Sequence, residues 1–219
     1  MIRAVLFDMD GLLFDSEAFY KAIWQEETTR LGFDLHDGLY AKLVGVPNAV
    51  CERYLTEWFP GFPLAEFQKS WRAIRDDRRA AQGIPLKAGA LELVTWLAEQ
   101  GVPMGLATSS SQGSVARNRS HAPDLFRFSV IMTIDKVSCP KPDPQIYELT
   151  AESLAVPLSE CVIFEDSNPG MRAAIASGAA AIMIPDLAIP ESDVLVGATN
   201  IYPSLLEAQT QHQDWLRRS

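Results

Sequence analysis

The sequence has few of the residues that mark a zinc site, a disulfide framework or a nucleic-acid surface. Only three of the 219 residues are cysteines (Cys51, Cys139 and Cys161), and they form no CxxC pair. An odd number of scattered cysteines argues against a disulfide framework and is typical of a reducing compartment. The three histidines are widely spaced, so no zinc cluster is visible. Lys and Arg total 19 against 28 Asp and Glu, a net charge of −9 that lacks the basic surface of a nucleic-acid binder.

Long hydrophobic runs are also missing. The longest nearly apolar stretch, 178–185, is far shorter than a membrane-spanning helix, and the opening MIRAVLFDMDG holds too short an apolar segment for a signal peptide. The negative charge would also be repelled by an anionic membrane surface. We therefore expect a cytoplasmic protein with no membrane and no nucleic-acid partner. An apolar fraction of 47% is ordinary for a globular chain, and at this length no disulfide or structural metal is needed for folding.

Short apolar segments alternate with helical patterns over most of the chain. Five of these segments predict buried strands: 4–7, 102–107, 129–133, 161–164 and 179–184. Helix openings lie between some of them, with Asp143 as a predicted N-cap before Pro144 and with the Asn168-Pro169 pair repeating this opening. This alternation predicts an α/β fold with a doubly wound parallel sheet covered on both faces. A last amphipathic helix is predicted at 204–218.

One region breaks the alternation. It contains no convincing strand and instead four successive helical patterns: 16–31, 37–45, 47–58 and 63–81. A crossover between two strands needs far fewer residues. We therefore predict an all-helical cap domain at 15–82, inserted into a catalytic core formed by 1–14 and 83–219.

Most aromatic residues of the insert are expected in the core of a small helical bundle. This set is Phe19, Tyr20, Trp24, Trp58 and Trp71. For Phe19 and Tyr20, which lie close behind the first strand, the alternative is contact with the ring of a substrate. The basic run 72–79, RAIRDDRR, is expected to be a solvated helix face, with attraction of an anionic substrate as the alternative.

Polar residues follow four of the predicted strands, at the edge where ligands of an open α/β sheet gather. In chain order they are Asp8 and Asp10, then Thr108, Ser109 and Ser110, then Lys141, then Glu165 and Asp166. Taken one at a time, each of these residues has a purely structural explanation. An Asp after a strand, for example, is usually a turn or cap residue. Two acidic pairs brought together repel each other unless a cation lies between them, and oxygen ligands without His or Cys suit Mg²⁺.

These residue types suit phosphoryl transfer. A carboxylate held at Mg²⁺ can act as a nucleophile and form an acyl phosphate. The transferred phosphoryl group needs cations and hydrogen-bond donors around it, which Lys141, the Thr108 hydroxyl and nearby backbone N–H groups can supply. A second carboxyl group two residues from the nucleophile can protonate the leaving oxygen and then activate water.

Four ordered motifs, DMDGLLFDSE, LATSS, CPKPDP and FEDSNPG, resemble those of the haloacid dehalogenase superfamily. The helical insert after the first motif resembles the subgroup of β-phosphoglucomutase and related sugar-phosphate phosphatases, which have a Rossmann-like core. The resemblance implies that Asp8 is the nucleophile and Asp10 the general acid/base. It also implies that Thr108, Ser109 and Lys141 surround the phosphate.

The resemblance implies a magnesium site as well. Asp166, with Glu165 close by, would hold Mg²⁺ together with Asp8 and the backbone carbonyl of Asp10. The dehalogenases that gave the superfamily its name lack the second Asp of the first motif. Asp10 therefore favours phosphoryl chemistry over dehalogenation, and the expected partner is a small phosphorylated metabolite.

The choice between phosphatase and phosphomutase depends on residues of the insert. Mutases of this subgroup hold a second phosphate through an Arg of a GVSR-like segment, and this chain has Asn48 at that place; Tyr20 replaces a mutase-like His. Both departures favour hydrolysis of a phosphomonoester, unless another residue such as Arg53 or Arg75 reaches the site. The opening motif looks closer to phosphatases of 2-deoxyglucose 6-phosphate or pseudouridine 5′-phosphate.

Two hypotheses other than a phosphatase or a phosphomutase stay open at this point. A receiver-like signalling domain also forms an aspartyl phosphate beside Mg²⁺, but such domains are much shorter and have no inserted cap that could act as a substrate lid. A catalytically inactive binding protein is disfavoured because every acidic position of the pattern is filled. No pattern in the sequence indicates an oligomeric state.

Overall fold

The computed structural model describes residues 2–44, 46 and 48–212. The chain divides into two compact units, one formed by Met1–Asp15 with Pro85–Ser219 and the other by Ser16–Ile84. The second unit begins one residue later and ends two residues later than the predicted insert, 15–82. None of the helices in the described part of the chain is long and apolar enough to span a bilayer.

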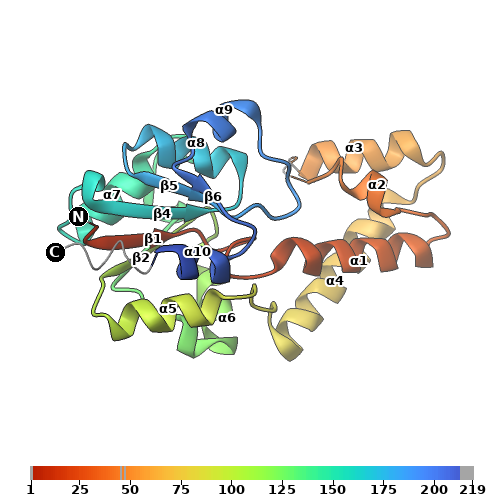
Figure 1. Ribbon diagram of the computed structural model, residues 1–219. Coiled ribbons are helices and arrows are strands. Elements are labelled where there is room, and N and C mark those ends of the chain that lie inside the picture. Colours follow the sequence, from red (N-terminus) through yellow and green to blue (C-terminus); the bar gives the residue numbers. More distant parts are fainter. Residues whose placement is uncertain (1, 45, 47, 213–219) are drawn as a thin grey trace. The chain divides into compact units, whose positions relative to one another are not determined.

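The first unit contains one six-stranded parallel sheet in the order β3-β2-β1-β4-β5-β6 (Figure 1). Its strands are β1 (Ala4–Phe7), β2 (Met104–Thr108), β3 (Val130–Thr133), β4 (Cys161–Glu165), β5 (Ala180–Met183) and β6 (Asn200–Ile201). The predicted doubly wound α/β architecture is confirmed. Strand β6 was not predicted, because two residues are too few to show a period of two.

Helices cover both faces of this sheet, with α7, α8 and α9 on one side and α5, α6 and α10 on the other (Figure 1). They are α5 (Ala90–Glu99), α6 (Gln112–His121), α7 (Gln145–Ser153), α8 (Asn168–Ala176), α9 (Ser192–Gly197) and α10 (Leu205–His212). Three short 3₁₀ turns complete the unit: Pro123–Leu125, Ile134–Lys136 and Leu158–Glu160. Of the predicted last helix, 204–218, the part beyond residue 212 lies outside the described residues.

Two helix starts differ from the prediction. The N-cap of α7 is Pro144 rather than Asp143, although the Asp143 carboxylate still accepts a hydrogen bond from the Gln145 N–H at 3.0 Å. The N-cap of α8 is Ser167, whose hydroxyl accepts from the Gly170 N–H at 3.1 Å. Asn168 is instead the first helical residue, and its side chain bonds the backbone of the loop that follows β5.

The three central strands are fully buried, as expected for a sheet covered on both faces. Their register brings the chemistry-bearing ends together. Phe7 of β1 pairs with Phe164 of β4, and Thr108 of β2 pairs with Thr133 of β3. Because all the strands run in parallel, the residues that follow these four positions emerge at one edge of the sheet.

The second unit is built from helices, and its described residues contain no strand. The helices are α1 (Ser16–Arg30), α2 (Asp37–Tyr40), α3 (Asn48–Trp58) and α4 (Leu64–Gln82). Helix α2 ends well before the predicted 45, since residues 41–44 form turns. The rings of Trp24, Phe67 and Trp71 pack together between α1 and α4, with the Trp24 and Phe67 centroids 5.2 Å apart. Of the predicted aromatic core of the insert, Phe19, Trp24 and Trp71 are buried and Tyr20 and Trp58 are only half-buried, so the prediction is confirmed for three of its five members.

The basic run of α4 is largely engaged in ion pairs. Arg72 pairs with Glu52 at 3.7 Å, and Arg78 pairs with Glu26 at 2.5 Å. The Nε of Arg75 lies 2.9 Å from the carboxylate of Asp76. A solvated, charge-balanced helix face therefore explains most of this run.

Candidate active site

Lys141 is at the centre of the buried polar cluster that follows the strands. Its ammonium nitrogen lies 2.6 Å from Asp8 Oδ1, 2.6 Å from Glu165 Oε1 and 3.1 Å from the carbonyl oxygen of Ala107. Only 5% of the Lys141 side chain is exposed. The structure thus brings together residues from the ends of β1, β2 and β4 and from the loop after β3, as the sequence predicts for ligands of an open sheet.

Glu165, the last residue of β4, has both carboxylate oxygens occupied by donors. Oε1 accepts from Lys141 and from the Tyr147 hydroxyl at 3.0 Å. Oε2 accepts from the backbone N–H groups of Asp166 and Ser167, each at 2.9 Å, and from the Ser167 hydroxyl. A carboxylate offers about four lone-pair sites. Glu165 therefore acts mainly as an anchor for Lys141, and its side chain has little capacity left for a metal ion.

Gly170 is required beside this anchor. A Cβ atom at that position would lie 1.7 Å from Glu165 Oε1. The glycine of the FEDSNPG motif therefore lets the first turn of α8 approach the Glu165 carboxylate.

Tyr147 and Ser167 were missed as functional residues. Besides its bond to Glu165, the Tyr147 ring lies under the Lys141 ammonium, 4.9 Å from nitrogen to ring centroid. Tyr147 is fully buried in α7. Its place in an ordinary apolar helix face gives no local signal, because its contacts with Lys141 and Glu165 are formed only by the folded loop and strand. Ser167 belongs to the FEDSNPG motif but had no predicted role, although a Ser three residues after the predicted strand end at 164 is a visible signal.

Asp166 has the geometry of a cation ligand. Its carboxylate is buried, and no hydrogen-bond partner for Oδ1 lies among the described residues. Ligand oxygens of Asp8, Glu165 and Asp166 all lie within 4.8 Å of one another. Gly11 leaves the space beside Asp166 open, since a Cβ there would lie 2.2 Å from Oδ2. An orphaned buried carboxylate oxygen in an all-oxygen cluster fits a hard cation such as Mg²⁺.

The electrostatics of the three acids differ. Burial raises the pKa of the Asp8 carboxyl to about 7, although the charge of Lys141 opposes the rise. Burial also raises the pKa of Asp166 well above its ordinary range, and the charges of Glu165 and Asp8 raise it further. Burial acts in the same direction on Glu165, but Lys141 and the hydrogen bonds from Ser167 outweigh it, so its pKa lies below the usual range. Glu165 is therefore the anionic partner of Lys141, and Asp8 and Asp166 are the pair that a cation would stabilise.

Asp10 is held apart from this cluster. Its Oδ2 accepts a 2.6 Å hydrogen bond from the Ser110 hydroxyl, and the Ser110 backbone N–H donates to Thr108 Oγ1 at 3.0 Å. The Asp10 side chain is not one of the three clustered carboxylates, so only its backbone carbonyl stays a candidate metal ligand. Thr108 is buried at the end of β2, whereas Ser109 is exposed. Ser110, which had no individual role in the prediction, is the serine that contacts an acid of the site.

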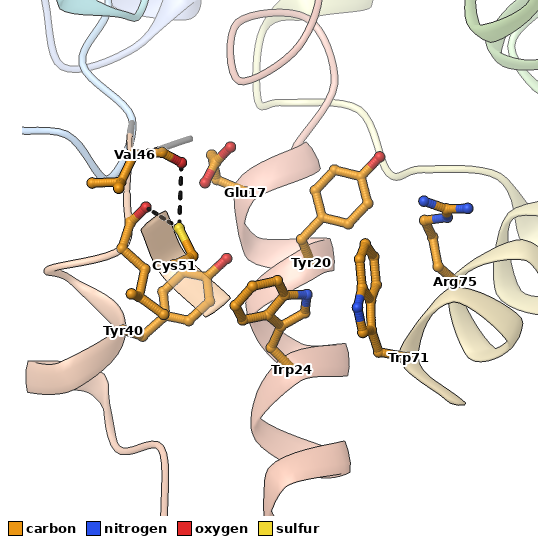
Figure 2. Close-up of a pocket in the computed structure, with 9 residues that line it drawn as sticks. Glu17, Tyr20, Trp24, Tyr40, Val46, Cys51, Trp71 and Arg75 are labelled. Atoms are coloured by element: carbon orange, nitrogen blue, oxygen red, sulfur yellow. Dashed lines mark hydrogen bonds between the residues drawn. The ribbon is translucent and has the colours of Figure 1, made fainter. Parts of the chain in front are cut away.

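The residues by which the sequence distinguishes a phosphatase from a phosphomutase lie in the second unit. Asn48 is the first residue of α3, and its side chain lies outside the described part of the structure. Tyr20 lines a cavity of this unit together with Arg75 (Figure 2). Arg53 pairs with Glu57 at 3.5 Å on the surface.

Residues 2–178 match a family model described as haloacid dehalogenase-like hydrolase. The chain belongs to the haloacid dehalogenase-like hydrolase family. The match spans all four motifs, so the resemblance seen in the sequence is confirmed.

Relatives within this family include named phosphatases. A phosphorylated carbohydrates phosphatase of Thermotoga maritima is 31% identical over 81% of this chain and 82% of its own. A validoxylamine A 7′-phosphate phosphatase of Streptomyces hygroscopicus subsp. limoneus is 29% identical over 90% of this chain and 93% of its own. The crystal structure of CbbY from Rhodobacter sphaeroides in complex with phosphate superposes with a TM-score of 0.68, at 26% identity, over 94% of this chain and 96% of that one. The expectation of an enzyme of the phosphoric monoester hydrolase class is confirmed.

Proposed function

We propose that this haloacid dehalogenase-like hydrolase is a Mg²⁺-dependent phosphatase of a small phosphomonoester, a sugar phosphate or nucleoside-type phosphate, with an aspartyl-phosphate intermediate on Asp8. The observation that supports it most is the buried cluster in which Lys141 bridges Asp8 and Glu165, while one Asp166 oxygen has no hydrogen-bond partner among the described residues. The named phosphatases among the relatives support the reaction class. We also retain as proposals the catalytic core, 1–14 and 83–219, and the cap, 15–82.

In the first half-reaction, a carboxylate oxygen of Asp8 attacks phosphorus and the bond from phosphorus to the ester oxygen breaks. Asp10, oriented by Ser110, gives its proton to that leaving oxygen. Lys141, already bonded to Asp8, balances charge on the nucleophile and on the phosphoryl oxygens. The Thr108 hydroxyl and the backbone N–H of Ser109 are the proposed donors to the remaining oxygens.

In the second half-reaction, Asp10 takes a proton from water as the water oxygen attacks phosphorus. The bond between phosphorus and Asp8 breaks, phosphate leaves and both carboxyl groups return to their starting states. One residue thus serves first as acid and then as base. These roles require the Asp10 carboxyl group to stay outside the cluster of metal-binding carboxylates, and its separate hydrogen bond to Ser110 supports this.

Asp8 and Asp166 would hold Mg²⁺ through their carboxylates, with the backbone carbonyl of Asp10 as a further ligand. The ion supplies positive charge that orients the phosphate and screens it from the acidic cluster. Glu165 supports the site indirectly, because its hydrogen bonds hold Lys141 and the start of α8 in place. The sequence predicts Asp8, Asp10, Glu165 and Asp166 at the metal site. Of these, the proposed ligands are now the carboxylates of Asp8 and Asp166 and the backbone carbonyl of Asp10.

Hydrolysis is favoured over mutase chemistry because the two arginines considered as substitutes for the second-phosphate anchor, Arg53 and Arg75, are already engaged in other contacts. Arg53 pairs with Glu57. Arg75 bonds Asp76, and its guanidinium lies 5.1 Å from the ring centroid of Trp71. A receiver-like switch is disfavoured because the match to a hydrolase family covers 2–178.

Replacement of the nucleophile tests the proposal. We expect Asp8→Asn to lose turnover of p-nitrophenyl phosphate and of a panel of sugar phosphates while keeping the wild-type circular dichroism spectrum. Asp124→Asn, which changes an exposed carboxyl of the same unit, is the matched control and should keep full activity. EDTA should abolish wild-type turnover and added Mg²⁺ should restore it. Full activity of Asp8→Asn, or activity independent of the metal, would contradict the mechanism.

A further inference from the structure

All three donors of the Lys141 ammonium group are engaged in the buried cluster. An ammonium carries three N–H donors. Two of them point to Asp8 Oδ1 and Glu165 Oε1, each at 2.6 Å. The third points to the carbonyl oxygen of Ala107 at 3.1 Å. In the proposed reaction Lys141 also has to donate to the phosphoryl group, so one of these three hydrogen bonds must be exchanged.

Asp8 is the acceptor that can give up its bond to Lys141. Attack on phosphorus turns its carboxylate into an uncharged acyl group, which accepts hydrogen bonds less strongly than an anion does. Glu165 takes no part in bond making and keeps its charge, and the carbonyl oxygen of Ala107 is fixed by the backbone of β2. One donor of Lys141 therefore passes from Asp8 to a phosphoryl oxygen, and the other two stay in place.

Tyr147 contacts both members of the pair that stays. Its ring centroid lies 4.9 Å from the Lys141 nitrogen. Its hydroxyl donates at 3.0 Å to Glu165 Oε1, the same oxygen that accepts from Lys141. The attraction between a cation and an aromatic ring is largest where both are removed from water. Tyr147 is 0% exposed and the Lys141 side chain is 5% exposed, so this contact is a strong one of its kind.

The backbone that carries Lys141 is joined to the helix that carries Tyr147. The side-chain oxygen of Gln145, the first residue of α7, accepts from the backbone N–H groups of Ser138 and Cys139, each at 2.8 Å. These bonds close the loop that contains Lys141 onto the start of α7. Because loop and helix form one fixed piece, the long side chain of Lys141 is the part that still has to be positioned.

We propose that Tyr147 is a positioning residue for Lys141 in phosphoryl transfer. Its ring keeps the ammonium nitrogen beside Glu165, and its hydroxyl keeps the Glu165 oxygen in place, while the donor that faces Asp8 turns to the phosphoryl group. Tyr147 thus acts through Lys141 and Glu165, and its role rests on the proposed function. A tyrosine with a purely structural role would contribute to folding alone, and its loss would leave the binding of a phosphoryl group unchanged.

Two substitutions separate the ring of Tyr147 from its hydroxyl. Tyr147→Leu removes both, whereas Tyr147→Phe keeps the ring. The probe is beryllofluoride with Mg²⁺, a phosphoryl analogue that binds an aspartate carboxylate, followed by fluorine NMR. We expect Tyr147→Leu to weaken its binding about tenfold, the size of a desolvated cation–π contact, and Tyr147→Phe to stay within about threefold of the wild type. The kcat for p-nitrophenyl phosphate should fall in the same order, with KM changed less than about twofold.

Phe126→Leu is the matched control, because it also removes a buried aromatic ring from the first unit. Phe126 packs against the rings of Phe14 and Phe128. We expect the control to lower the urea midpoint, as Tyr147→Leu does, but to bind beryllofluoride like the wild type. Equal losses of binding in Phe126→Leu and Tyr147→Leu would overturn the role of Tyr147. Equal losses in Tyr147→Phe and Tyr147→Leu would overturn it as well, since the ring would then not hold the ammonium.

A crystal structure of the wild type with Mg²⁺ and beryllofluoride tests the exchange without any substitution, and so covers the case in which Tyr147→Leu fails to fold. We expect the Lys141 nitrogen to lie within hydrogen-bond distance of Glu165 Oε1 and of a fluorine atom, over the ring of Tyr147. A nitrogen that had left Glu165 and the ring would overturn the proposal. A wild type that neither bound beryllofluoride nor hydrolysed p-nitrophenyl phosphate would contradict the proposed function, and the role of Tyr147 with it.

Discussion

The ammonium nitrogen of Lys141 lies 2.6 Å from Asp8 Oδ1, a contact between two buried side chains 133 residues apart in the sequence. Lys141 comes from the loop after β3 and Asp8 directly follows β1. The same nitrogen is 2.6 Å from Glu165, so one cation serves two carboxylates. The cluster is therefore a single electrostatic unit, and removing one member exposes the others to the cost of an unpaired buried charge.

Removal of the cation should cost both stability and activity. Lys141→Met keeps most of the side-chain volume but leaves Asp8 and Glu165 without their buried partner. We expect unfolding free energy to fall by about 3–5 kcal/mol, the usual cost of breaking a buried pair, and phosphatase turnover to be lost. Urea denaturation and p-nitrophenyl phosphate assays measure the two effects. Lys136→Met changes an exposed lysine of the same unit and should stay near wild-type stability. Wild-type stability in Lys141→Met would refute the electrostatic unit.

Gly11 should control access to the proposed metal site. The Cβ of Gly11→Ala would lie 2.2 Å from Asp166 Oδ2, and the backbone at this position has a φ of +85°. We expect the Mg²⁺ concentration for half-maximal turnover to rise at least tenfold. Gly178→Ala is the matched control, since its φ is +78° and nothing lies within 4 Å of the added Cβ. Both variants bear the backbone cost of about 1–2 kcal/mol, so only the change in Mg²⁺ dependence separates them. Equal Mg²⁺ dependence would remove Asp166 from the ligand set.

Ser110 should affect proton transfer without touching the metal cluster. Ser110→Ala removes the 2.6 Å hydrogen bond to Asp10 Oδ2, so the Asp10 carboxyl loses one of the contacts that orient it. We expect kcat to fall about tenfold and the pH profile of kcat to shift, with little change in Mg²⁺ dependence. Ser109→Ala alters the exposed neighbour and leaves its backbone N–H in place, so it should keep wild-type kcat. The opposite ranking of the two variants would reverse the assignment of the serines.

Glu27 should make the second unit less stable as the pH is lowered. This buried carboxylate accepts from Arg30 Nε at 2.9 Å and Nη2 at 2.7 Å, and from the Ser70 hydroxyl of α4. The hydrogen bond from Arg30 is the main cause of its lowered pKa. A lowered pKa in the folded state means that the stabilisation is complete above the unfolded value, about 4.3, and is lost as the pH falls through the folded value.

The matching variant is Glu27→Gln. We expect it to unfold more easily than the wild type by about 1–3 kcal/mol at pH 7, and the difference to shrink below pH ~4. Urea denaturation followed by tryptophan fluorescence reports on this unit, which holds three of the five tryptophans of the chain. A difference that stayed constant with pH would show that the charge of Glu27 has no part in the stabilisation.

Local sequence patterns were sufficient for much of the fold. The buried strands β1 and β4 have continuous apolar runs, helix α4 is amphipathic and helix α1 ends before Gly32, so these elements were predicted to within a few residues. The weak elements were missed for an equally local reason. Helix α6, QGSVARNRSH, buries only Val115 and Asn118 and therefore shows no apolar period. Such elements are stabilised by their neighbours in the fold.

The candidate active site was likewise predictable from the sequence only in part. The acids and the lysine at the strand ends are visible in the sequence, because parallel strands place their carboxyl ends at one edge and because four motifs occur in a recognisable order. Which residues contact which was decided only by the tertiary structure. The hydrogen bond of Ser110 to Asp10, that of Lys141 to Asp8 and that of Tyr147 to Glu165 join residues 100, 133 and 18 positions apart in the chain. Sequence spacing specifies the chemical groups and the edge they reach, whereas hydrogen-bond partners depend on packing to within a fraction of an ångström.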